Sequence, residues 1–218
     1  MSSPAPTALP SFPATLEVEY PDRELNRLTT AFRIFTVIPI FVVLGLIVGP
    51  GSGGGAAAHR HGGGFGCTSA GVLSAATALM ILFRQKYPRW WFEWNRELMR
   101  FSARIGVYIA LMEDRYPSTD DHQAVHLEFE YPDARNDLNR WLPLVKWLLA
   151  IPHYIVLFFL YIAAFFVVVA AWFVILFTGR YPRGMFDFLV GVGRWTNRVI
   201  AYAHVLVTDR YPPFRLAP

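Results

Sequence analysis

The stretch LPLVKWLLAIPHYIVLFFLYIAAFFVVVAAWFVILF, residues 142–177, decides the fold of this chain. Lys146 is its only charged residue and His153 is its only histidine. A helix that crosses a bilayer needs about 20 apolar residues, so this stretch is long for one span and slightly short for two. The pattern predicts a segment that lies in a membrane.

The rest of the chain is also rich in apolar residues. Only 17% of the 218 residues are charged, whereas about 25% is usual for a soluble domain. The Lys and Arg residues behind the net charge of +4 lie beside the apolar runs and not in a basic tail, so we expect no nucleic-acid partner. Arg60 is the single basic residue within residues 49–68, so the positive-inside rule predicts that the strands and both termini are cytoplasmic.

Two segments of the chain, residues 16–117 and 127–215, carry the same motifs in the same order. LEVEYPD at 16–22 recurs as LEFEYPD at 127–133, LNR at 25–27 recurs at 138–140, YPR at 87–89 recurs at 181–183, and DRYP at 114–117 recurs at 209–212. Arg100, Arg104 and Tyr108 likewise correspond to Arg194, Arg198 and Tyr202. The order predicts an internal duplication, with a flexible lead-in at 1–15 and a linker at 118–126.

Each unit is expected to hold a short strand, a transmembrane or re-entrant helical hairpin, and an amphipathic interfacial helix at about 91–112 or 185–207. The second of these helices is more apolar, and its alternative placement is buried against the hairpins. The Gly- and His-rich segment 49–68 aligns opposite Ile162 and Ala163, where a polar insertion fits a hairpin turn better than a helix inside hydrocarbon. A single long helix, kinked at Pro152, is the alternative for the second unit. The expected fold class is an all-α membrane protein of two tandem pseudo-symmetric units, whose two strands can pair with each other.

The second unit also carries a resemblance to a known family. IPHYIVLFFLYIAAFFVVVAAWFVILFTGRYPRGMFDF at 151–188, followed by RVIAYAHVLVTDRYPPF at 198–214, resembles a family of uncharacterised bacterial integral membrane proteins, classed as a domain of unknown function. The first unit resembles the family more loosely, and it has Arg-Gln-Lys where the second unit has Thr178, Gly179 and Arg180. The resemblance implies the bacterial inner (cytoplasmic) membrane and no known activity.

Arginines at helical spacing form two one-sided cationic stripes. Such stripes can bind anionic lipid headgroups, at about 1 kcal/mol per residue near a charged surface. The alternative is structural pairing with acids of the chain itself, such as Glu97 and Asp187, and both alternatives stay open. The candidates are Arg96, Arg100, Arg104, Arg194 and Arg198.

Small residues at Gly191, Gly193 and Ala201 predict a helix face that packs closely against another helix, which favours an assembly role. The Asp-Arg-Tyr-Pro and Tyr-Pro-Arg motifs are interpreted as helix stops, because proline ends a helix while tyrosine and arginine suit a membrane interface.

Histidines and the single cysteine are the remaining candidates for ligand binding. His59, His61 and Cys67 supply three donors, fewer than the four that a structural zinc site needs, so we expect no metal. His153 and His204 can ligate a porphyrin, although a satisfied histidine is the commoner case, so we expect no cofactor.

The sequence holds no recognisable catalytic set or nucleotide-binding loop, so we expect no enzyme. The apolar runs contain no acidic residue, which argues against a pump or an ion-coupled transporter. We therefore expect a non-enzymatic accessory or scaffold subunit of a membrane assembly, or a membrane-organising element. The alternatives are a lipid or small-molecule carrier with its site between the two repeats, and a haem- or pigment-binding subunit. The expected partners are the bilayer, including anionic lipids, and other membrane subunits or a second copy of the chain.

Overall fold

The computed structural model describes residues 12–22, 25–48, 69–118 and 123–217. In chain order the elements are β1 (Ala14–Val18), α1 (Arg27–Val48), α2 (Ser69–Leu79) with a π-helical turn η1 (Met80–Arg84), α3 (Arg89–Ile109), β2 (Val125–Phe129), α4 (Pro143–Leu149), α5 (Ile151–Thr178) and α6 (Arg183–Ala203).

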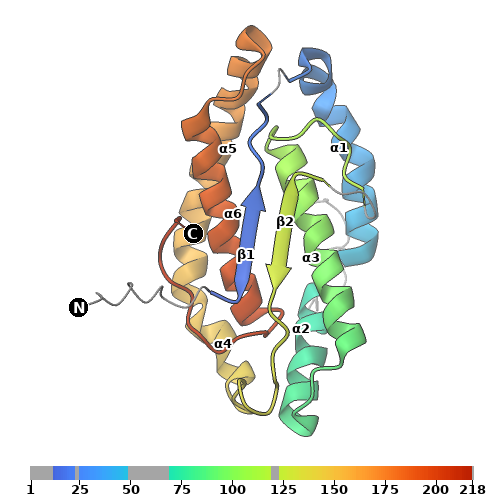
Figure 1. Cartoon of the computed structure of the whole chain (residues 1–218), viewed down its shortest axis with the longest axis vertical. Helices are drawn as coiled ribbons and strands as arrows, with labels where there is room; N and C mark the ends of the chain where they lie inside the picture. Colours follow the sequence, from blue (N-terminus) through green and yellow to red (C-terminus); the bar gives the residue numbers. More distant parts are fainter. Residues whose placement is uncertain (1–11, 23–24, 49–68, 119–122, 218) are drawn as a thin grey trace, which may run out of the picture.

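The elements are stacked in three layers (Figure 1). β1 and β2 form a two-stranded ribbon, with α3 packed against β2 and α6 packed against β1. α5 packs on α6, and α1 packs on both α3 and α5. We call α1 and α5 the outer layer, because α3 and α6 lie between them and the ribbon.

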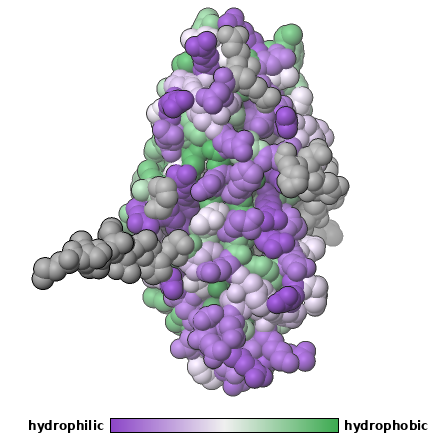
Figure 2. Space-filling view, viewed as in Figure 1, coloured by the Kyte–Doolittle hydropathy of each residue, from purple (hydrophilic) through white to green (hydrophobic). Residues whose placement is uncertain are grey.

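The ribbon is antiparallel and places Leu16 opposite Leu127. These two leucines are corresponding residues of the two predicted units, so each strand pairs with its counterpart about its own centre. The strands begin two residues earlier than their LEVEY and LEFEY motifs. Period-two alternation buries the two leucines and exposes the neighbouring polar residues, which are Thr15, Glu17, Glu19, His126, Glu128 and Glu130. Figure 2 shows the resulting, mostly hydrophilic face.

The helical hairpin predicted over residues 142–177 is wrong. α4 ends at Leu149, and α5 is one continuous helix of 28 residues. No glycine or proline lies between Pro152 and Gly179, and a helix satisfies its own backbone hydrogen bonds, so nothing in this run calls for a turn. The alternative of one long helix is the observed one, and Pro152 lies in its first turn, where a missing N–H does no harm.

The first unit does not form an antiparallel hairpin either. Arg33 and Thr36 of α1 bond to Tyr108 near the end of α3, whereas Thr77 of α2 accepts a hydrogen bond from Trp91 at its start. α1 and α2 therefore follow one another in the same direction along α3, as the colours of Figure 1 also show. The predicted Gly- and His-rich loop at 49–68 lies outside the described residues.

The prediction of an interfacial helix at 185–207 is wrong for α6, which is an inner element. Most of its length is buried between β1 and α5. The two predicted arginines of α6 were interpreted as an outward-facing stripe. In the structure they donate hydrogen bonds to the ribbon and to the C-terminal segment. α3 is amphipathic as expected, with Phe92 and Ile105 buried and Glu93 and Glu97 exposed.

Several contacts occur twice, once in each of the two predicted units. The Tyr87 hydroxyl donates to the carbonyl oxygen of Val205, and the Tyr181 hydroxyl donates to that of Ala110, both at 2.9 Å. A leucine with positive φ follows each inner helix: φ is 65° at Leu111 and 60° at Leu206. Each turns the chain sharply and brings the next aspartate back to the start of a helix on the same half.

Candidate functional site

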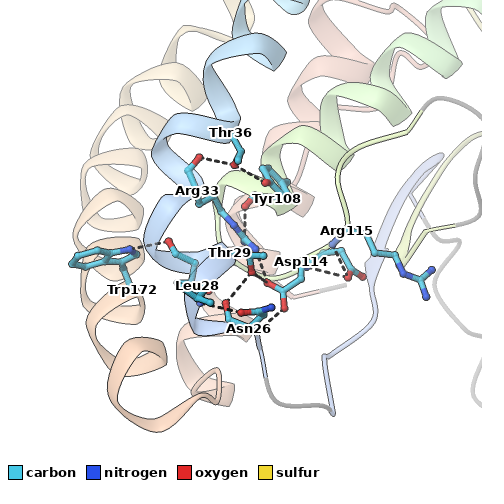
Figure 3. Close-up of polar contacts among 11 residues, drawn as sticks. Asn26, Leu28, Thr29, Arg33, Thr36, Tyr108, Asp114, Arg115 and Trp172 are labelled. Atoms are coloured by element: carbon cyan, nitrogen blue, oxygen red, sulfur yellow. Dashed lines mark hydrogen bonds and ion pairs between the residues drawn. The ribbon is translucent and has the colours of Figure 1, made fainter.

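A buried ion pair joins the start of α1 to the end of α3 (Figure 3). Arg33 Nη2 lies 2.6 Å from Asp114 Oδ1, and Arg33 Nη1 donates to the carbonyl oxygen of Tyr108 at 3.0 Å. The guanidinium also lies over the Tyr108 ring, 4.5 Å from its centroid. Asp114 Oδ2 accepts a hydrogen bond of 2.9 Å from the Asn26 backbone N–H. Both charges are thereby engaged inside the protein.

A second buried ion pair joins α4 to the end of α6. Lys146 Nζ lies 2.7 Å from Asp209 Oδ1 and donates to the carbonyl oxygen of Thr208 at 2.7 Å. The ammonium lies 5.2 Å from the centroid of the Tyr202 ring. Asp209 Oδ2 accepts a hydrogen bond of 2.5 Å from the Asn139 backbone N–H. Arg33 and Lys146 therefore play the same part in the two halves.

These ion pairs were not predicted from the sequence, where each Asp-Arg-Tyr-Pro motif was interpreted as a helix stop. The signal that could have revealed them is an aspartate that recurs together with a lone cation in an otherwise apolar chain. Burial lowers the pKa of the Lys146 ammonium, while the hydrogen bond and charge of Asp209 act in the opposite direction. Because each carboxylate is held by a cation and a backbone N–H, the pairs fix helix ends and offer no free base for chemistry.

Two of the predicted arginines tie the inner helices to the ribbon. Arg100 Nε donates to the carbonyl oxygen of Leu127 at 2.9 Å, and Arg194 Nε donates to that of Leu16 at 3.0 Å. Each arginine thus bonds to the central residue of a strand. Arg100 also forms ion pairs with Glu97 and Glu128, the kind of partner that the structural alternative named, whereas Arg194 bonds to a backbone carbonyl.

The other three predicted arginines also contact the protein. Arg96 Nη2 lies 3.1 Å from Glu97, and Arg104 donates to the carbonyl oxygen of Ser118 at 2.5 Å. Arg198 is buried and donates to backbone carbonyls of the C-terminal segment. Lipid-headgroup binding by these side chains stays a prediction.

The small residues of α6 face segments that are not helices. A Cβ on Gly191 would lie 2.9 Å from Leu216 Cβ in the C-terminal segment, and one on Gly193 would lie 3.0 Å from Leu16 of β1. Ala201 is fully buried in the main core. These residues let a strand and the C-terminal segment approach the helix closely.

Both candidate porphyrin ligands are held by aromatic neighbours. His153 is fully buried, accepts a hydrogen bond of 3.1 Å at Nδ1 from Trp195, and stacks on Phe214 with ring centroids 4.0 Å apart. His204 Nε2 lies 3.2 Å from the Tyr154 hydroxyl.

The predicted weak metal candidates His59, His61 and Cys67 lie outside the described residues. Within the ranges that the structure describes, no group of three or more His, Cys, Asp or Glu residues is arranged to hold a metal ion.

The outer layer exposes a continuous apolar surface. α5 is the one helix among the described residues that is long and apolar enough to cross a membrane, and most of it is exposed. Phe165 and Phe166 are each 64% exposed, and Phe177 is 79% exposed. The other large exposed side chains among the described residues of this layer are Leu28, Phe32, Phe35, Ile38, Ile151, Tyr154, Ile155, Phe158, Phe159, Tyr161, Ile162, Val169 and Phe173.

An apolar cavity of about 480 Å³ lies between the two inner helices, α3 and α6, with walls from α5 and β1. Among the residues that the structure describes, those that line it are all uncharged. The sequence analysis expected a carrier site, if any, between the two units, and this cavity occupies that place.

Comparison with known proteins places one part of the chain in a family. A family model described as Domain of unknown function (DUF4389) matches residues 141–215. The chain contains a DUF4389 domain. No curated protein and no solved structure matches the chain.

The DUF4389 domain covers α4, α5 and α6. It contains the Lys146–Asp209 ion pair and most of the exposed aromatic surface of the outer layer. Both strands lie outside it, so α6 of the DUF4389 domain packs against β1, which comes from the N-terminal part of the chain.

Proposed function

We propose that this protein is a non-enzymatic membrane protein whose outer layer lies in the bilayer and whose ribbon faces water. In this role it organises the membrane or anchors other membrane subunits. The observation that carries the proposal is the exposed apolar surface of α5, on the far side of α6 from a charged ribbon.

The pattern of burial along α5 supports contact with lipid. The helix buries only a narrow stripe, made of His153, Leu157, Ala171 and Ile175, and leaves its phenylalanines exposed. Exposed apolar patches on soluble monomers rarely exceed a few hundred Å². A core helix of a soluble protein would be covered on all sides, and α5 is not.

The ribbon argues for a helix that lies along the membrane and does not cross it. α5 is about 42 Å long at 1.5 Å per residue, and the ribbon, on the other side of α6, lies level with the middle part of α5 (Figure 1). If α5 stood upright, Glu17, Glu19, Glu128 and Glu130 would lie at membrane depth, where a charged side chain costs about 2.5–3.5 kcal/mol or more. Placing α5 along the plane of one leaflet keeps these carboxylates in water.

We further propose that the chain is a tandem duplication with a pseudo-twofold axis through the Leu16–Leu127 pair. The recurring tyrosine, arginine and ion-pair contacts support it, because each joins residues that the repeated motifs place in correspondence. A symmetric pair of units would carry two apolar helical paths, α1 with α2 on one side and α5 on the other.

Such a layer inserted into one leaflet acts as a wedge, which gives the membrane-organising role a physical basis. The cytoplasmic leaflet of the bacterial inner membrane is the proposed location, in keeping with the positions of the Lys and Arg residues. Anionic lipids, other membrane subunits or a second copy of the chain are the proposed partners.

Membrane association is tested first by fractionation of cells that express the full chain. We expect the protein to sediment with membranes after a urea wash at neutral pH and to need detergent for release. A chain that remains in the aqueous supernatant would overturn the proposal.

The placement of α5 is tested with single cysteines in a Cys67→Ser background, labelled by a membrane-impermeant maleimide. Glu128→Cys on the ribbon should label when the cytoplasmic side is open, and Phe158→Cys should stay protected. Leu149→Cys and Thr178→Cys, at the two ends of the helical path, should label from the same side. Labelling of these two ends from opposite sides would show a spanning helix and contradict the placement of α5 along one leaflet.

A further inference from the structure

We infer that the cavity between α3 and α6 binds a single unbranched acyl chain. The inference rests on the proposed membrane location, because the bilayer is the source of the ligand. It adds a specific binding site to the proposed organising role. Apolar pockets of about 300–1,000 Å³ are typical of small-molecule sites, and this cavity measures about 480 Å³.

The cavity exists because α3 carries smaller side chains than α6 at corresponding positions. Ser102, Ala103 and Gly106 of α3 match Thr196, Asn197 and Ile200 of α6, and all six residues line the space. A Cβ built on Gly106 meets no atom within 4 Å. The missing volume is therefore on the α3 side.

The polar side chains of the lining that the structure describes all form hydrogen bonds within the protein, including the Tyr161 hydroxyl, which lies 2.9 Å from Thr196 Oγ1. Ser102 Oγ donates to the carbonyl oxygen of Leu98 at 2.9 Å, and Thr196 Oγ1 donates to that of Val192 at 2.8 Å. Asn197 Nδ2 likewise bonds to its own helix, at 2.9 Å. Each of the Ser102, Thr196 and Asn197 side chains donates to a backbone carbonyl oxygen one turn earlier on its own helix. The walls of the cavity therefore favour an apolar ligand over a polar one.

The position of the cavity indicates where its ligand comes from. Tyr161 and Phe165 line it and are also exposed on the outer layer, at 49% and 64%. The cavity is thus continuous with the surface that we place in lipid. An open apolar space of this size loses packing contacts when empty, and the ligand available beside it in a bilayer is an acyl chain.

The experiment uses the purified full chain in detergent and a palmitic acid that bears a diazirine near the end of its chain. After irradiation and proteolysis, we expect adducts on α3 within residues 99–112 and on α6 within residues 189–200, and unlabelled palmitic acid should compete. A second arm with a diazirine-bearing phosphatidylcholine in nanodiscs separates the two sources: labelling in the first arm alone indicates a free fatty acid, and labelling in both indicates that a lipid tail also enters.

Gly106→Leu is the variant that fills the cavity, and Gly184→Leu is its matched control. Both positions are helical glycines with open space around the added Cβ, but Gly184 does not line the cavity. We expect Gly106→Leu to reduce the α3 and α6 adducts by about tenfold or more, with unchanged or raised thermal stability, and Gly184→Leu to label as the parent does. If Gly106→Leu does not fold, Ala103→Leu takes its place.

Adducts confined to the exposed face of α5, at residues such as Phe158 and Phe173, would overturn the inference, as would equal labelling of both glycine variants. Such results leave membrane association intact, because fractionation tests that separately. A chain that needs no detergent for release would instead overturn the proposed function.

Discussion

The two ion-pair sites, Arg33 with Asp114 and Lys146 with Asp209, have the same arrangement built from different cations. Arg33 uses two nitrogens, one for the carboxylate and one for a backbone carbonyl, whereas Lys146 meets both needs with Nζ alone. Each aspartate also accepts from the backbone N–H of a corresponding asparagine. The site therefore requires a cation that reaches two oxygens and does not require a particular side chain, as expected of a structural clamp.

Removing the aspartate of either ion pair should have the largest effect on the free energy of unfolding. Asp209→Ala leaves the Lys146 ammonium buried without its carboxylate, and Asp114→Ala does the same to Arg33. We expect each to lower the free energy of unfolding by about 3–5 kcal/mol, measured by thermal melts in detergent followed by circular dichroism. Asp187→Ala, at an exposed position, is the control and should change it by less than about 0.5 kcal/mol. Equal stability of Asp209→Ala and the parent would show that the clamp is unimportant.

Exchanging the two cations should have a moderate and unequal effect. Arg33→Lys keeps the ion pair and loses one hydrogen bond, at a cost of about 0.5–1.5 kcal/mol. Lys146→Arg places a larger group where the side chain is fully buried, and overpacking costs about 1–3 kcal/mol. Arg33→Met and Lys146→Met are the charge-removing controls, and each should cost more than the matching exchange. If Arg33→Lys is as damaging as Arg33→Met, the guanidinium geometry itself is required.

Gly179 and Gln85 follow the apolar helices of the two predicted units. Substitutions at these two positions should have smaller effects on stability, and the two effects should have opposite signs. Gly179 has φ of 74°, and Gln85 at the corresponding place has φ of 45°. A left-handed residue other than glycine costs about 1–2 kcal/mol, so Gly179→Ala should destabilise by about 1 kcal/mol and Gln85→Gly should stabilise by a similar or smaller amount. Melts of the two variants test this. Destabilisation by Gln85→Gly would show that its side chain makes a compensating contact.

The last effect is absent at neutral pH and is confined to alkaline solution. Burial raises the pKa of the Tyr87 and Tyr181 phenols above the ordinary value of 10.0. The folded state therefore holds these protons more tightly, so its stability is retained below pH 10 and falls as the pH rises above it. Between pH 10 and 11 the loss is at most about 1.4 kcal/mol per tyrosine.

Urea unfolding at several pH values measures this slope. The double variant Tyr87→Phe, Tyr181→Phe should lose less stability over this range than the parent, although it is less stable at neutral pH. Identical slopes for the two proteins would contradict the assignment.

Sequence patterns predicted the elements better than their arrangement. Period-two alternation located both strands to within two residues, and the apolar run at 142–177 located α5. The hairpin prediction failed because the alignment placed the 49–68 insertion opposite Ile162 and Ala163, and the insertion was taken as evidence for a turn in both units.

The predicted arginines show why the contacts of the candidate site could not be predicted from the sequence. Helical spacing put Arg100 and Arg194 on stripes, but a stripe has the same pattern whether it faces lipid or a strand. The choice depends on what packs beside the helix, and the strands that bond to these arginines are 27 and 178 residues away in sequence. Gly191 and Gly193 were likewise correctly seen as small faces, yet their neighbours are a strand and the C-terminal segment.

The sequence by itself determined the apolar character of α5, the two alternating strands and the repeated order of motifs, because each of these depends on residues close together in the chain. Only the tertiary structure decided that the two strands pair with each other, that α6 is buried, and that Asp114 and Asp209 meet cations more than 60 residues earlier. Those contacts, and the cavity between α3 and α6, arise where the two halves meet or where a chain end folds back. Their geometry depends on side-chain volumes from several elements at once, which no local pattern records.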